Sequence, residues 1–316
     1  MIPQIICVVG PTATGKTKMG VALAHRFGGE VVSVDSMQIY RGMTVGTAAP
    51  TEEETEGVPH HMIAVADPRE SWSVAKFTEQ AALCVQDILR RGKRPVLVGG
   101  TGLYLDSLVS GRTFAPGHSS GETRKRLQAE LAERGVEELY RELMEIDPVC
   151  AERLSLGDEK RILRALEVYR QTGETITEHD ERTRALPPKY QAYYIGLTFL
   201  DRADLYDRID RRVDAMVEKG LLREVEALLQ RGLPEDATAL QAIGYKQFLS
   251  VRRGEATTAE AVAEVKLRSR QYAKRQLTWL RRKTDIHWIE WEKERDFGRA
   301  LQVSTEILTA AGVSYP

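Results

Sequence analysis

The residue pattern with the clearest chemistry lies near the start of the chain, where residues 10–17 read Gly-Pro-Thr-Ala-Thr-Gly-Lys-Thr. This segment fills every required position of G-x-x-x-x-G-K-[ST], a loop whose backbone N–H groups bind phosphate. Its two glycines allow consecutive N–H groups to point at one anion, and a following helix N-terminus adds about half a positive charge. Lys16 brings a full charge, and the hydroxyl of Thr17 suits Mg²⁺. The pattern predicts a phosphate site without saying whose phosphates it holds.

The residues around this loop favour phosphate binding over nucleotide hydrolysis. An apolar run at 5–9 leads into the loop, and apolar residues at helical spacing follow it. Nucleotide hydrolases with such a loop usually place an aspartate at the end of another apolar strand, to hold Mg²⁺. Here the apolar strand at 95–98 ends in Gly-Gly-Thr, and no Asn-Lys-x-Asp guanine signature is present. The sequence is therefore strong evidence for phosphates and weak evidence for hydrolysis.

Three polar side chains that could take part in catalysis or binding follow the ends of predicted strands. Asp35 could bind Mg²⁺, act as a general base, or cap the next helix. Gln38 has an amide that can pair with the edge of adenine, or it is an exposed turn residue. Thr101 follows two glycines, so its hydroxyl could bind a substrate or cap a helix. Position alone leaves these alternatives open.

The elements that must position these residues alternate between strand and helix over the first ~110 residues. Strands are predicted at 5–9, 30–34, 62–66 and 95–98, with helices between them, notably over 74–91. This rhythm implies parallel β-α-β units, in which ligands gather beyond the carboxyl ends of the strands. The expected fold class is α/β, with a P-loop NTPase-like parallel sheet flanked by helices.

The pattern changes after residue 112. Residues 113–192 are charged and helix-periodic, and the strand pattern returns at 193–200. From residue 201 onward the pattern is nearly all helical. The sequence therefore predicts a core made of 1–112 and 193–316, interrupted by an all-helical insertion domain over 113–192.

Composition sets further bounds. The 316 residues are 29% charged and 42% hydrophobic, with a net charge of −1, as in a globular protein. No apolar run reaches the ~20 residues of a membrane span, and because a strand is predicted from residue 5, no signal peptide is expected. Cys7, Cys84 and Cys150 lack C-x-x-C spacing, and the histidines lack zinc-site spacing. Free thiols in a reducing cytoplasm are expected, and a monomer is the default.

Positive charge gathers in one segment despite the neutral balance of the whole chain. Residues 266–283 contain eight Lys or Arg and no acid, interleaved with Tyr272 and Trp279. Such a segment either faces nucleic-acid phosphates or forms a solvated basic face. A smaller basic group lies in the predicted insertion, at Lys160, Arg161 and Arg164.

One arginine falls inside an apolar helical stripe. The helix predicted to start near residue 202 carries Arg212 on its apolar face, whereas Arg211 points away. The stripe consists of Leu205, Ile209, Val213 and Met216. An arginine turned inward needs an anionic partner, which could be a ligand or a buried acid, unless the side chain reaches outward to solvent.

Taken together, several segments resemble the tRNA dimethylallyltransferase family, the isopentenyltransferases that modify adenine 37 beside the anticodon. The resemblance runs in order from residue 5 to about residue 290. It rests on 10–17, Val34-Asp35-Ser36 with Ile39-Tyr40, Pro59-His60-His61, 97–104, 161–168, Gly244-Tyr245 and the Arg-Gln-x-Ala-Lys-Arg-Gln-x-Thr-Trp run at 270–279.

The resemblance implies a chemistry for the residues singled out above. The substrate would be dimethylallyl diphosphate, whose allylic carbon is attacked by N6 of adenine while pyrophosphate departs. Asp35 would be the general base, Thr101 would support the attacking amine, and Lys16 and Arg212 would stabilise the leaving group. The diphosphate-binding residues would be Gly10, Thr12, Ala13, Thr14, Gly15, Lys16 and Thr17, with Mg²⁺ held by Thr17.

The resemblance also implies contact with the tRNA anticodon stem-loop, with the target base flipped into a pocket near Asp35 and Gln38. The core and the insertion would lie on either side of the anticodon loop. The residues expected to contact tRNA are Asp35, Ser36, Gln38, Thr101, Lys160, Arg161, Arg164, Gly244, Tyr245, Lys246, Arg270, Lys274, Arg275 and Thr278. Two other functions are weighed beside this one: a small-molecule kinase using ATP at the loop, and a non-catalytic RNA-binding module.

Overall fold

The computed structural model describes residues 2–112, 114 and 121–314. The chain divides into two compact units, one formed by Met1–Val109 with Lys189–Pro316 and the other by Ser110–Pro188. The second unit therefore begins and ends a few residues earlier than the insertion predicted over 113–192. No described helix combines the length and the apolar character that a membrane span requires.

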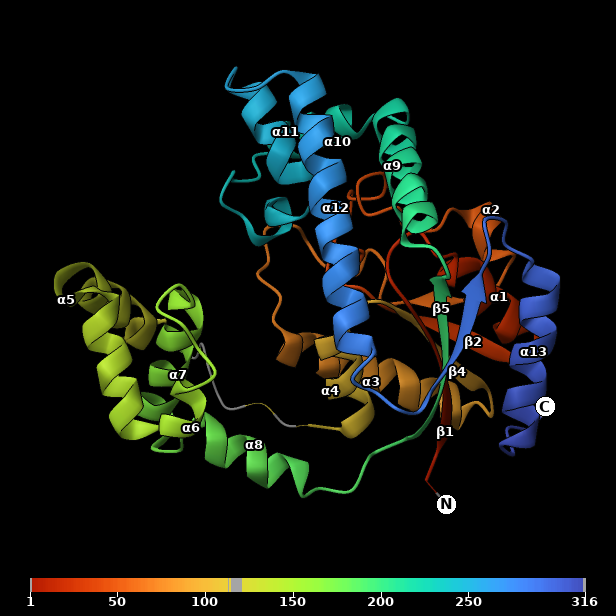
Figure 1. Cartoon of the computed structure of the whole chain (residues 1–316), viewed down its shortest axis with the longest axis horizontal. Coiled ribbons are helices and arrows are strands. Elements are labelled where there is room, and N and C mark those ends of the chain that lie inside the picture. The colour runs from red at the N-terminus through yellow and green to blue at the C-terminus, as the bar shows by residue number, and fades with distance from the viewer. Residues whose placement is uncertain (1, 113, 115–120, 315–316) are drawn as a thin grey trace. The chain divides into compact units, whose positions relative to one another are not determined.

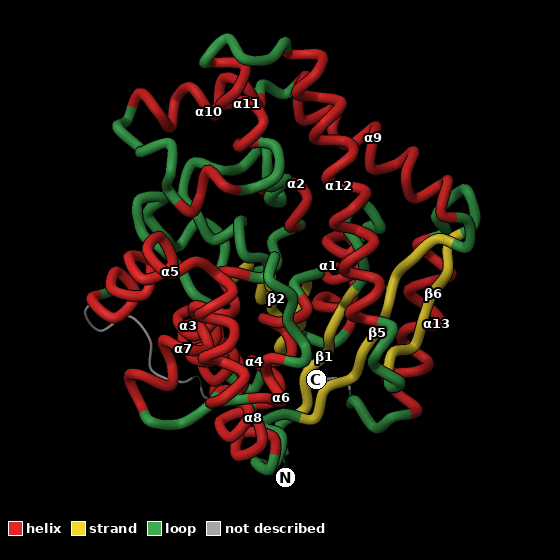
Figure 2. The backbone as a smooth tube through the Cα atoms, turned by 60° about the vertical axis from the view of Figure 1, so that its left-hand side comes forward, coloured by secondary structure: helices red, strands yellow, loops and turns green. Residues whose placement is uncertain are grey.

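The larger unit is built on one sheet of parallel strands. Within the described residues its order is β3-β2-β4-β1-β5-β6, and every pairing is parallel. Figures 1 and 2 show strands of this sheet among the helices of the larger unit. The strands are β1 (Gln4–Val9), β2 (Gly29–Val34), β3 (His60–His61), β4 (Arg94–Gly99), β5 (Gln191–Phe199) and β6 (Ile286–Trp291). The carboxyl ends of β1, β2 and β4 are neighbours, so the segments that follow them meet at one edge.

Two sequence-based predictions about strands are wrong. Residues 62–66 do not form a strand, because Met62 and Ala64 have φ of 63° and 52°, in the left-handed region that interrupts extended backbone. The strand beside β2 is instead the two-residue β3, and Ala66 keeps an isolated bridge to Tyr40. Conversely, β6 lies in the region expected to be nearly all helical.

Apolar side chains of the central strands alternate between two cores, one on each face of the sheet. In β1, Ile5, Cys7 and Val9 belong to one core, while Ile6 and Val8 belong to the other. Because both faces are covered by helices, the strand is apolar along its whole length.

Helices cover both faces of the sheet (Figure 1). The helices of the larger unit are α1 (Lys16–Arg26), α2 (Glu52–Thr55), α3 (Val74–Arg90), α4 (Gly102–Ser110), α9 (Arg202–Glu218), α10 (Leu221–Gln230), α11 (Tyr245–Arg252), α12 (Thr258–Leu280) and α13 (Phe297–Ala310), with a 3₁₀ turn at Thr238–Gln241. The predicted helix at 74–91 corresponds to α3, which the side chain of Ser73 caps by accepting from the N–H of Lys76 at 3.2 Å.

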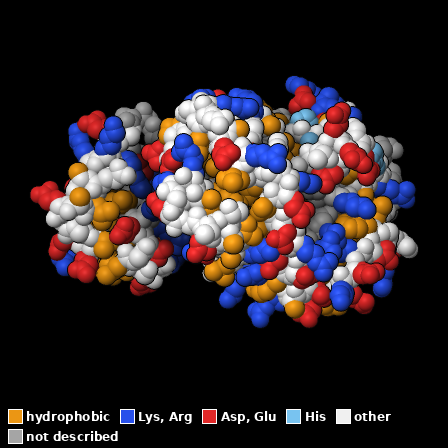
Figure 3. All heavy atoms as spheres, turned by 90° about the horizontal axis from the view of Figure 1, so that it is seen from above, with side chains coloured by type: hydrophobic (Ala, Val, Ile, Leu, Met, Phe, Trp, Pro, Cys, Tyr) orange, Lys and Arg blue, Asp and Glu red, His pale blue; other side chains and the backbone are white. Residues whose placement is uncertain are grey.

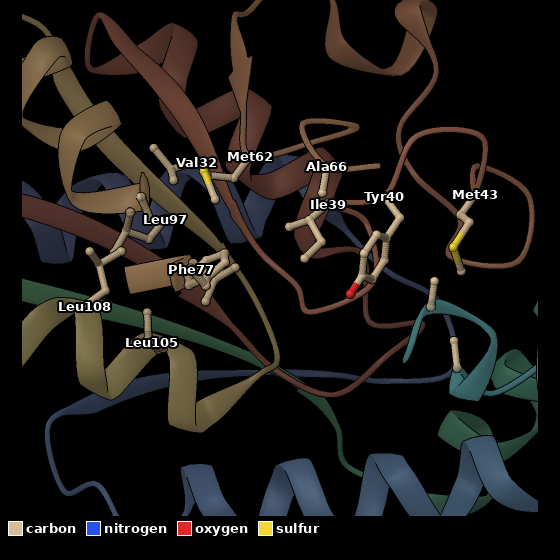
Figure 4. Packing of buried hydrophobic residues seen from close by; sticks show 14 of the residues in the cluster. Val32, Ile39, Tyr40, Met43, Met62, Ala66, Phe77, Leu97, Leu105 and Leu108 are labelled. Atoms are coloured by element: carbon tan, nitrogen blue, oxygen red, sulfur yellow. The ribbon is translucent and has the colours of Figure 1, made fainter. Parts of the chain in front are cut away.

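One of the two cores anchors the segment that follows β2. Figure 4 shows Ile39, Tyr40 and Met43 packed with residues of the sheet and of neighbouring helices, among them Phe77 and Leu105. Ile39, Tyr40 and Met43 are almost fully buried. Residues 39–43 are therefore a fixed base for the polar residues 35–38 that precede them.

The smaller unit is all-helical within its described residues and has a core of its own. Its helices are α5 (Glu122–Ile146), which breaks at Gly135, α6 (Pro148–Ala151), α7 (Glu159–Thr172) and α8 (Ile176–Arg184). Leu127, Leu139, Leu143, Ile162 and Leu166 are buried together. Asp147 caps α6 through the N–H of Cys150 at 3.0 Å and accepts from the N–H of Thr177 at 3.0 Å, which ties α8 to α6.

Candidate active site

The loop that follows β1 has the backbone geometry of a phosphate cradle. Gly10 and Gly15 have φ of 148° and 91°, and Ala13 has φ of 68°. A Cβ atom on Gly10 would lie 2.3 Å from the carbonyl oxygen of Leu197, so only glycine fits beside β5. Since α1 begins at Lys16, the loop brings its N–H groups to the positive end of that helix.

Residues far away in the sequence hold this loop in place. At the end of β6, Trp291 donates from Nε1 to the carbonyl of Thr14 at 2.9 Å. In α12, Oε1 of Gln276 accepts from the backbone N–H of Thr12 at 3.0 Å. This contact engages the backbone N–H of Thr12, and the rest of Thr12 lines the cavity. The hydroxyl of Thr14 likewise donates within the loop, to the carbonyl of Pro11 at 2.9 Å.

A cavity of about 370 Å³ brings the sequence-predicted residues together. Its wall includes most of the predicted diphosphate-binding residues and the polar residues after β2. From these two groups it contains Thr12, Ala13, Gly15, Lys16, Thr17, Asp35, Ser36 and Gln38. Arg212 of α9 and Arg275 of α12 also face it, whereas Gly10, Thr14 and Thr101 are not part of its wall.

Two cations converge on this cavity. Burial, reinforced by the charge of Arg212, lowers the pKa of Lys16 to about 7, while Asp35 acts in the opposite sense. Burial also holds the pKa of Arg212 below its usual value, and its Nε has no hydrogen-bond partner among the described residues. Nζ of Lys16 donates to the carbonyl of Pro11 at 2.7 Å. Two cations desolvated side by side are unfavourable without an anion, which makes this end of the cavity an anion site.

Asp35 both caps a turn and keeps an oxygen available. Its Oδ1 accepts from the N–H groups of Met37 at 2.8 Å and Gln38 at 3.2 Å, which fixes the carboxylate after β2. Its Oδ2 makes no hydrogen bond to a described residue. The next helix, α2, begins only at Glu52, so Asp35 caps a turn and not a helix, and its second oxygen is available to act as a general base.

The amide of Gln38 is engaged by the protein on both sides. Its Oε1 accepts from the hydroxyl of Ser33 at 2.8 Å, and its Nε2 donates to the carbonyls of Thr47 at 3.3 Å and Ala48 at 3.4 Å. These contacts tie the 44–48 loop to the end of β2. Gln38 faces the cavity in one fixed orientation, so it is not the exposed turn residue of the alternative interpretation.

Tyr272 of α12 is a cavity residue that the sequence indicated only as an aromatic group in a basic segment. Burial and then the charge of Asp35 raise the pKa of Tyr272 to about 12. Its hydroxyl is therefore protonated at neutral pH and lies beside Thr101. The buried hydroxyl of the neighbouring Thr101 has no hydrogen-bond partner among the described residues. The helical spacing of four residues between Tyr272 and Gln276 was the available signal that both share a face.

Glu224 in α10 is a positioning residue that the sequence analysis missed. Its Oε2 accepts from the N–H groups of Thr44 and Val45, both at 2.8 Å, and its Oε1 accepts from the N–H of Gly46 at 3.0 Å. The hydroxyl of Tyr245 donates to the same carboxylate. In the sequence Glu224 is one of two acids on an amphipathic helix, and nothing distinguishes it from Glu226.

The predicted tRNA contacts at Gly244 and Tyr245 need correction. Tyr245 is fully buried beneath the 44–48 loop, and Gly244 is buried beside it, so neither presents a side chain to RNA. The neighbouring Lys246 is exposed. Tyr245 instead supports the 44–48 loop, because its hydroxyl donates to Glu224, the residue that holds the N–H groups of that loop.

The basic segment 266–283 divides into two parts. In its first part, Lys266 pairs with Asp214 at 2.6 Å and Arg270 pairs with Asp210 at 2.6 Å, because α9 lies beside α12 (Figure 1). Arg270, predicted to contact tRNA, is thus an ion-pair partner of α9. Arg268 also pairs with an acid, Glu264, at 2.6 Å. Figure 3 shows Lys and Arg interspersed with acidic side chains on the face seen there.

The second part of the segment is exposed at some positions, although Lys283 at its end pairs with Asp106 at 2.9 Å. Lys274, Arg275 and Thr278 are exposed, and the guanidinium of Arg275 lies 5.7 Å from the ring centroid of Tyr272. In the smaller unit Lys160 is exposed, whereas Arg161 pairs with Asp158 at 3.0 Å and Arg164 with the buried Glu167 at 3.1 Å. Fewer Lys and Arg side chains are therefore exposed without an acidic partner than the sequence suggested.

Comparison with known proteins agrees with the resemblance stated from the motifs. The model of the IPP transferase family matches residues 38–283, and that of isopentenyl transferase matches residues 3–66. The tRNA dimethylallyltransferase of Acetivibrio thermocellus is 46% identical over 286 residues, covering 90% of this chain and 91% of the relative. That of Carboxydothermus hydrogenoformans is 44% identical over 315 residues, covering 99% of each chain.

Solved structures give the same result. The tRNA isopentenylpyrophosphate transferase of Bacillus halodurans has a TM-score of 0.72 at 40% identity, covering 98% of this chain and 96% of the other. A eukaryotic dimethylallyltransferase acting on tRNA has a TM-score of 0.82 at 28% identity, covering 99% of this chain and 80% of the other. With a family model that spans most of its length and relatives this similar, the chain belongs to the IPP transferase family.

Proposed function

We propose that this chain transfers a dimethylallyl group from dimethylallyl diphosphate to N6 of adenine 37 of tRNA, with release of pyrophosphate. The observation that carries the proposal is that one cavity joins an anion site, made by the phosphate loop with Lys16 and Arg212, to the carboxylate of Asp35. The names of the most similar relatives, which are tRNA dimethylallyltransferases, support it.

At the anion end, negative charge develops on the leaving oxygen as the C–O bond of the donor breaks. The loop N–H groups, Lys16 and Arg212 stabilise this charge in a largely desolvated site, where electrostatic interactions are strong. Lys16 must be protonated for this role, and a bound diphosphate favours its charged form.

Mg²⁺ fits this end of the cavity. The hydroxyl of Thr17 lines the cavity and makes no hydrogen bond to a described residue, so its oxygen is available as a ligand. No cluster of three or more His, Cys, Asp or Glu able to hold a metal is found among the described residues, and Mg²⁺ commonly takes its remaining ligands from phosphates and water. When bound, the ion would neutralise charge on the leaving group.

At the other end, the exocyclic amine of adenine attacks the allylic carbon and must lose a proton. Oδ2 of Asp35 is free to accept that proton, because Oδ1 is held by the N–H groups of Met37 and Gln38. Thr101 and the protonated hydroxyl of Tyr272 lie together near Asp35 and would orient the amine. The target base must leave its stack to reach the cavity.

The exposed Lys274 and Arg275 of α12 are the best candidates on the core for contact with the phosphates of the anticodon stem-loop. In the smaller unit, Lys160 offers an exposed cation for the same substrate. We further propose that the chain acts as a monomer in the cytoplasm. Its cysteines, Cys7, Cys84 and Cys150, are all free, which suits a reducing compartment.

The proposal is tested by incubating the protein with Mg²⁺, labelled dimethylallyl diphosphate and tRNA that lacks the modification. Label should enter the tRNA at adenine 37 and an equal amount of pyrophosphate should appear. Phosphate transfer from ATP to a metabolite would indicate the kinase alternative. RNA binding without transfer would indicate the RNA-binding module, and either result would overturn the proposal.

A further inference from the structure

A cluster of three cations that are not part of the cavity wall lies next to the phosphate loop. It consists of Lys18 in α1, Arg208 in α9 and Arg295, which follows β6. The ring of Phe297 joins two of them, because Nζ of Lys18 lies 4.7 Å and the guanidinium of Arg295 lies 5.1 Å from its centroid. Nη1 of Arg295 is 3.0 Å from where a Cβ atom on Gly15 would stand, so this arginine packs directly on the loop.

Arg208 connects this outer cluster to the cavity. It is near enough to Arg295 that its charge adds to the effect of burial in lowering the pKa of Arg295. Arg208 also stands four residues before Arg212 in α9, which places the two on one face of the helix. Gly15 and Arg212 both line the cavity. The outer cations therefore adjoin its anion end at two points, Arg295 at Gly15 and Arg208 one helical turn from Arg212.

These cations are not neutralised by the protein. None of the three forms an ion pair with an acid within 4.0 Å among the described residues, whereas Arg211 in the same helix pairs with Asp207 at 2.8 Å. Asp296, next to Arg295, instead caps α13 by accepting from the N–H of Arg299 at 2.9 Å. The cluster also lies at the positive end of α1. Positive charges that lie together at a helix N-terminus repel one another, and a bound anion would offset this repulsion.

We propose that Lys18, Arg208 and Arg295 form an outer anion site that captures the diphosphate of the prenyl donor and passes it to the phosphate loop. The proposal rests on the proposed function, which supplies the donor. A small, highly charged anion fits because the cluster adjoins Gly15 and lies one helical turn from Arg212, both of which face the diphosphate end of the cavity. Clustered cations beside a desolvated site raise the local concentration of an anionic substrate and its association rate.

The test compares the double variant Arg208→Gln/Arg295→Gln with the matched control Arg211→Gln, which removes one charge from the other face of the same helix. The binding of inorganic pyrophosphate is measured by calorimetry, and kcat/KM for dimethylallyl diphosphate is measured from low to high salt. We expect the double variant to bind pyrophosphate about five-fold more weakly at low salt, with kcat/KM reduced to match and a flatter dependence on salt. The control should behave as the parent protein.

Further variants separate charge from packing. The double variant Arg208→Lys/Arg295→Lys keeps the charge and should bind pyrophosphate nearly as well as the parent. Lys18→Gln changes an exposed side chain without disturbing the contact of Arg295 with Gly15. Thermal unfolding of each variant identifies any that is misfolded. If Lys18→Gln and the folded double variant both bind pyrophosphate as the parent does, the outer site is refuted. A loss of affinity for the tRNA stem-loop alone would also refute it, since the cations would then contact RNA.

Failure of the proposed function is distinguishable from failure of this inference. If the parent protein transfers no prenyl group to tRNA, the proposed function fails whatever the variants do. If the parent transfers the group and the variants match it at every salt concentration, the outer site alone fails.

Discussion

The side-chain oxygen Oε1 of Gln276 accepts a hydrogen bond from the backbone N–H of Thr12 at 3.0 Å, across 264 positions of sequence. The same buried amide donates from Nε2 to the carbonyl of Gly100 at 3.1 Å. One side chain of α12 therefore joins the phosphate loop to the end of β4, where Thr101 follows. The parts of the site that would hold the leaving group and the attacking amine are fixed relative to each other by this amide.

Gln276→Leu should weaken both stability and turnover. Leaving the N–H of Thr12 and the carbonyl of Gly100 without partners in a buried place costs about 1–3 kcal/mol, measured by urea unfolding. Because the two loops lose their fixed separation, we expect kcat to fall about ten-fold or more. Gln276→Glu keeps the acceptor for Thr12 but sets a carboxylate against the carbonyl of Gly100. Equal kcat values for the parent and both variants would show that the bridge has no role in catalysis.

Asp35→Asn should reduce the rate of prenyl transfer far more than binding. The amide keeps an oxygen for the N–H groups of Met37 and Gln38 but cannot take a proton from the adenine amine. We expect a single-turnover rate about 10²–10⁴-fold lower. The affinity for the stem-loop, measured by fluorescence anisotropy, should change only slightly. A variant that transfers the group at the parental rate would exclude the general-base role.

The binding of pyrophosphate should depend on pH through Lys16. Its pKa in the folded protein is lowered to about 7, so the side chain loses its proton as pH rises through neutrality and is charged below it. Affinity for pyrophosphate, measured by calorimetry from pH 6 to pH 9, should therefore decrease toward high pH, with proton uptake on binding. Lys16→Arg stays charged throughout this range and should remove this contribution to the decrease. A parental affinity that is constant or rises with pH would contradict the lowered pKa.

The buried Glu30 in β2 should contribute strongly to stability. It is 2% exposed and accepts from Arg91, from Lys93 at 3.0 Å and from His61 at 2.8 Å. Its removal in Glu30→Ala leaves Lys93 without an acidic partner among the described residues and leaves Arg91 with Asp87 alone. We expect a loss of about 3 kcal/mol in the free energy of unfolding.

The exposed pair of Glu138 and Arg141 provides the control, and Glu138→Ala should cost less than about 1 kcal/mol. The hydrogen bond from Arg91 holds the pKa of Glu30 below its usual range, so this stability is present above the ordinary Glu pKa and is lost as pH falls below it. Equal effects of the two substitutions in urea unfolding would contradict this account.

Lys274 and Arg268, both in α12, should differ in their effect on RNA binding. Lys274 is exposed with no acidic partner among the described residues, whereas Arg268 is paired with Glu264. Lys274→Gln should weaken binding of the anticodon stem-loop and reduce the slope of log K against log salt by about 1. Arg268→Gln should leave that slope unchanged. If both variants keep the parental slope, Lys274 is not a phosphate contact.

Several features of the site could be predicted because they depend on local sequence. The phosphate loop is specified by its own glycines and by the apolar strand before it, and the segment after β2 by the turn that Asp35 caps. The inward direction of Arg212 follows from helical periodicity, which fixes the face on which a side chain lies. Periodicity also identified the helical character of the insertion, since its apolar residues recur every three or four positions.

Other features required the tertiary structure, because they depend on partners that only packing brings near. The sequence shows no acid within 266–283, yet Asp210 and Asp214 of α9 neutralise Lys266 and Arg270 once the two helices lie together. The burial of Tyr245 and the contact of Gln276 with Thr12 are likewise decided by distant elements. Residues 62–66 look extended in sequence, but left-handed backbone at Met62 and Ala64 turns them away from the sheet. Local sequence thus determined which groups could do the chemistry, and packing decided which of them remain free to do it.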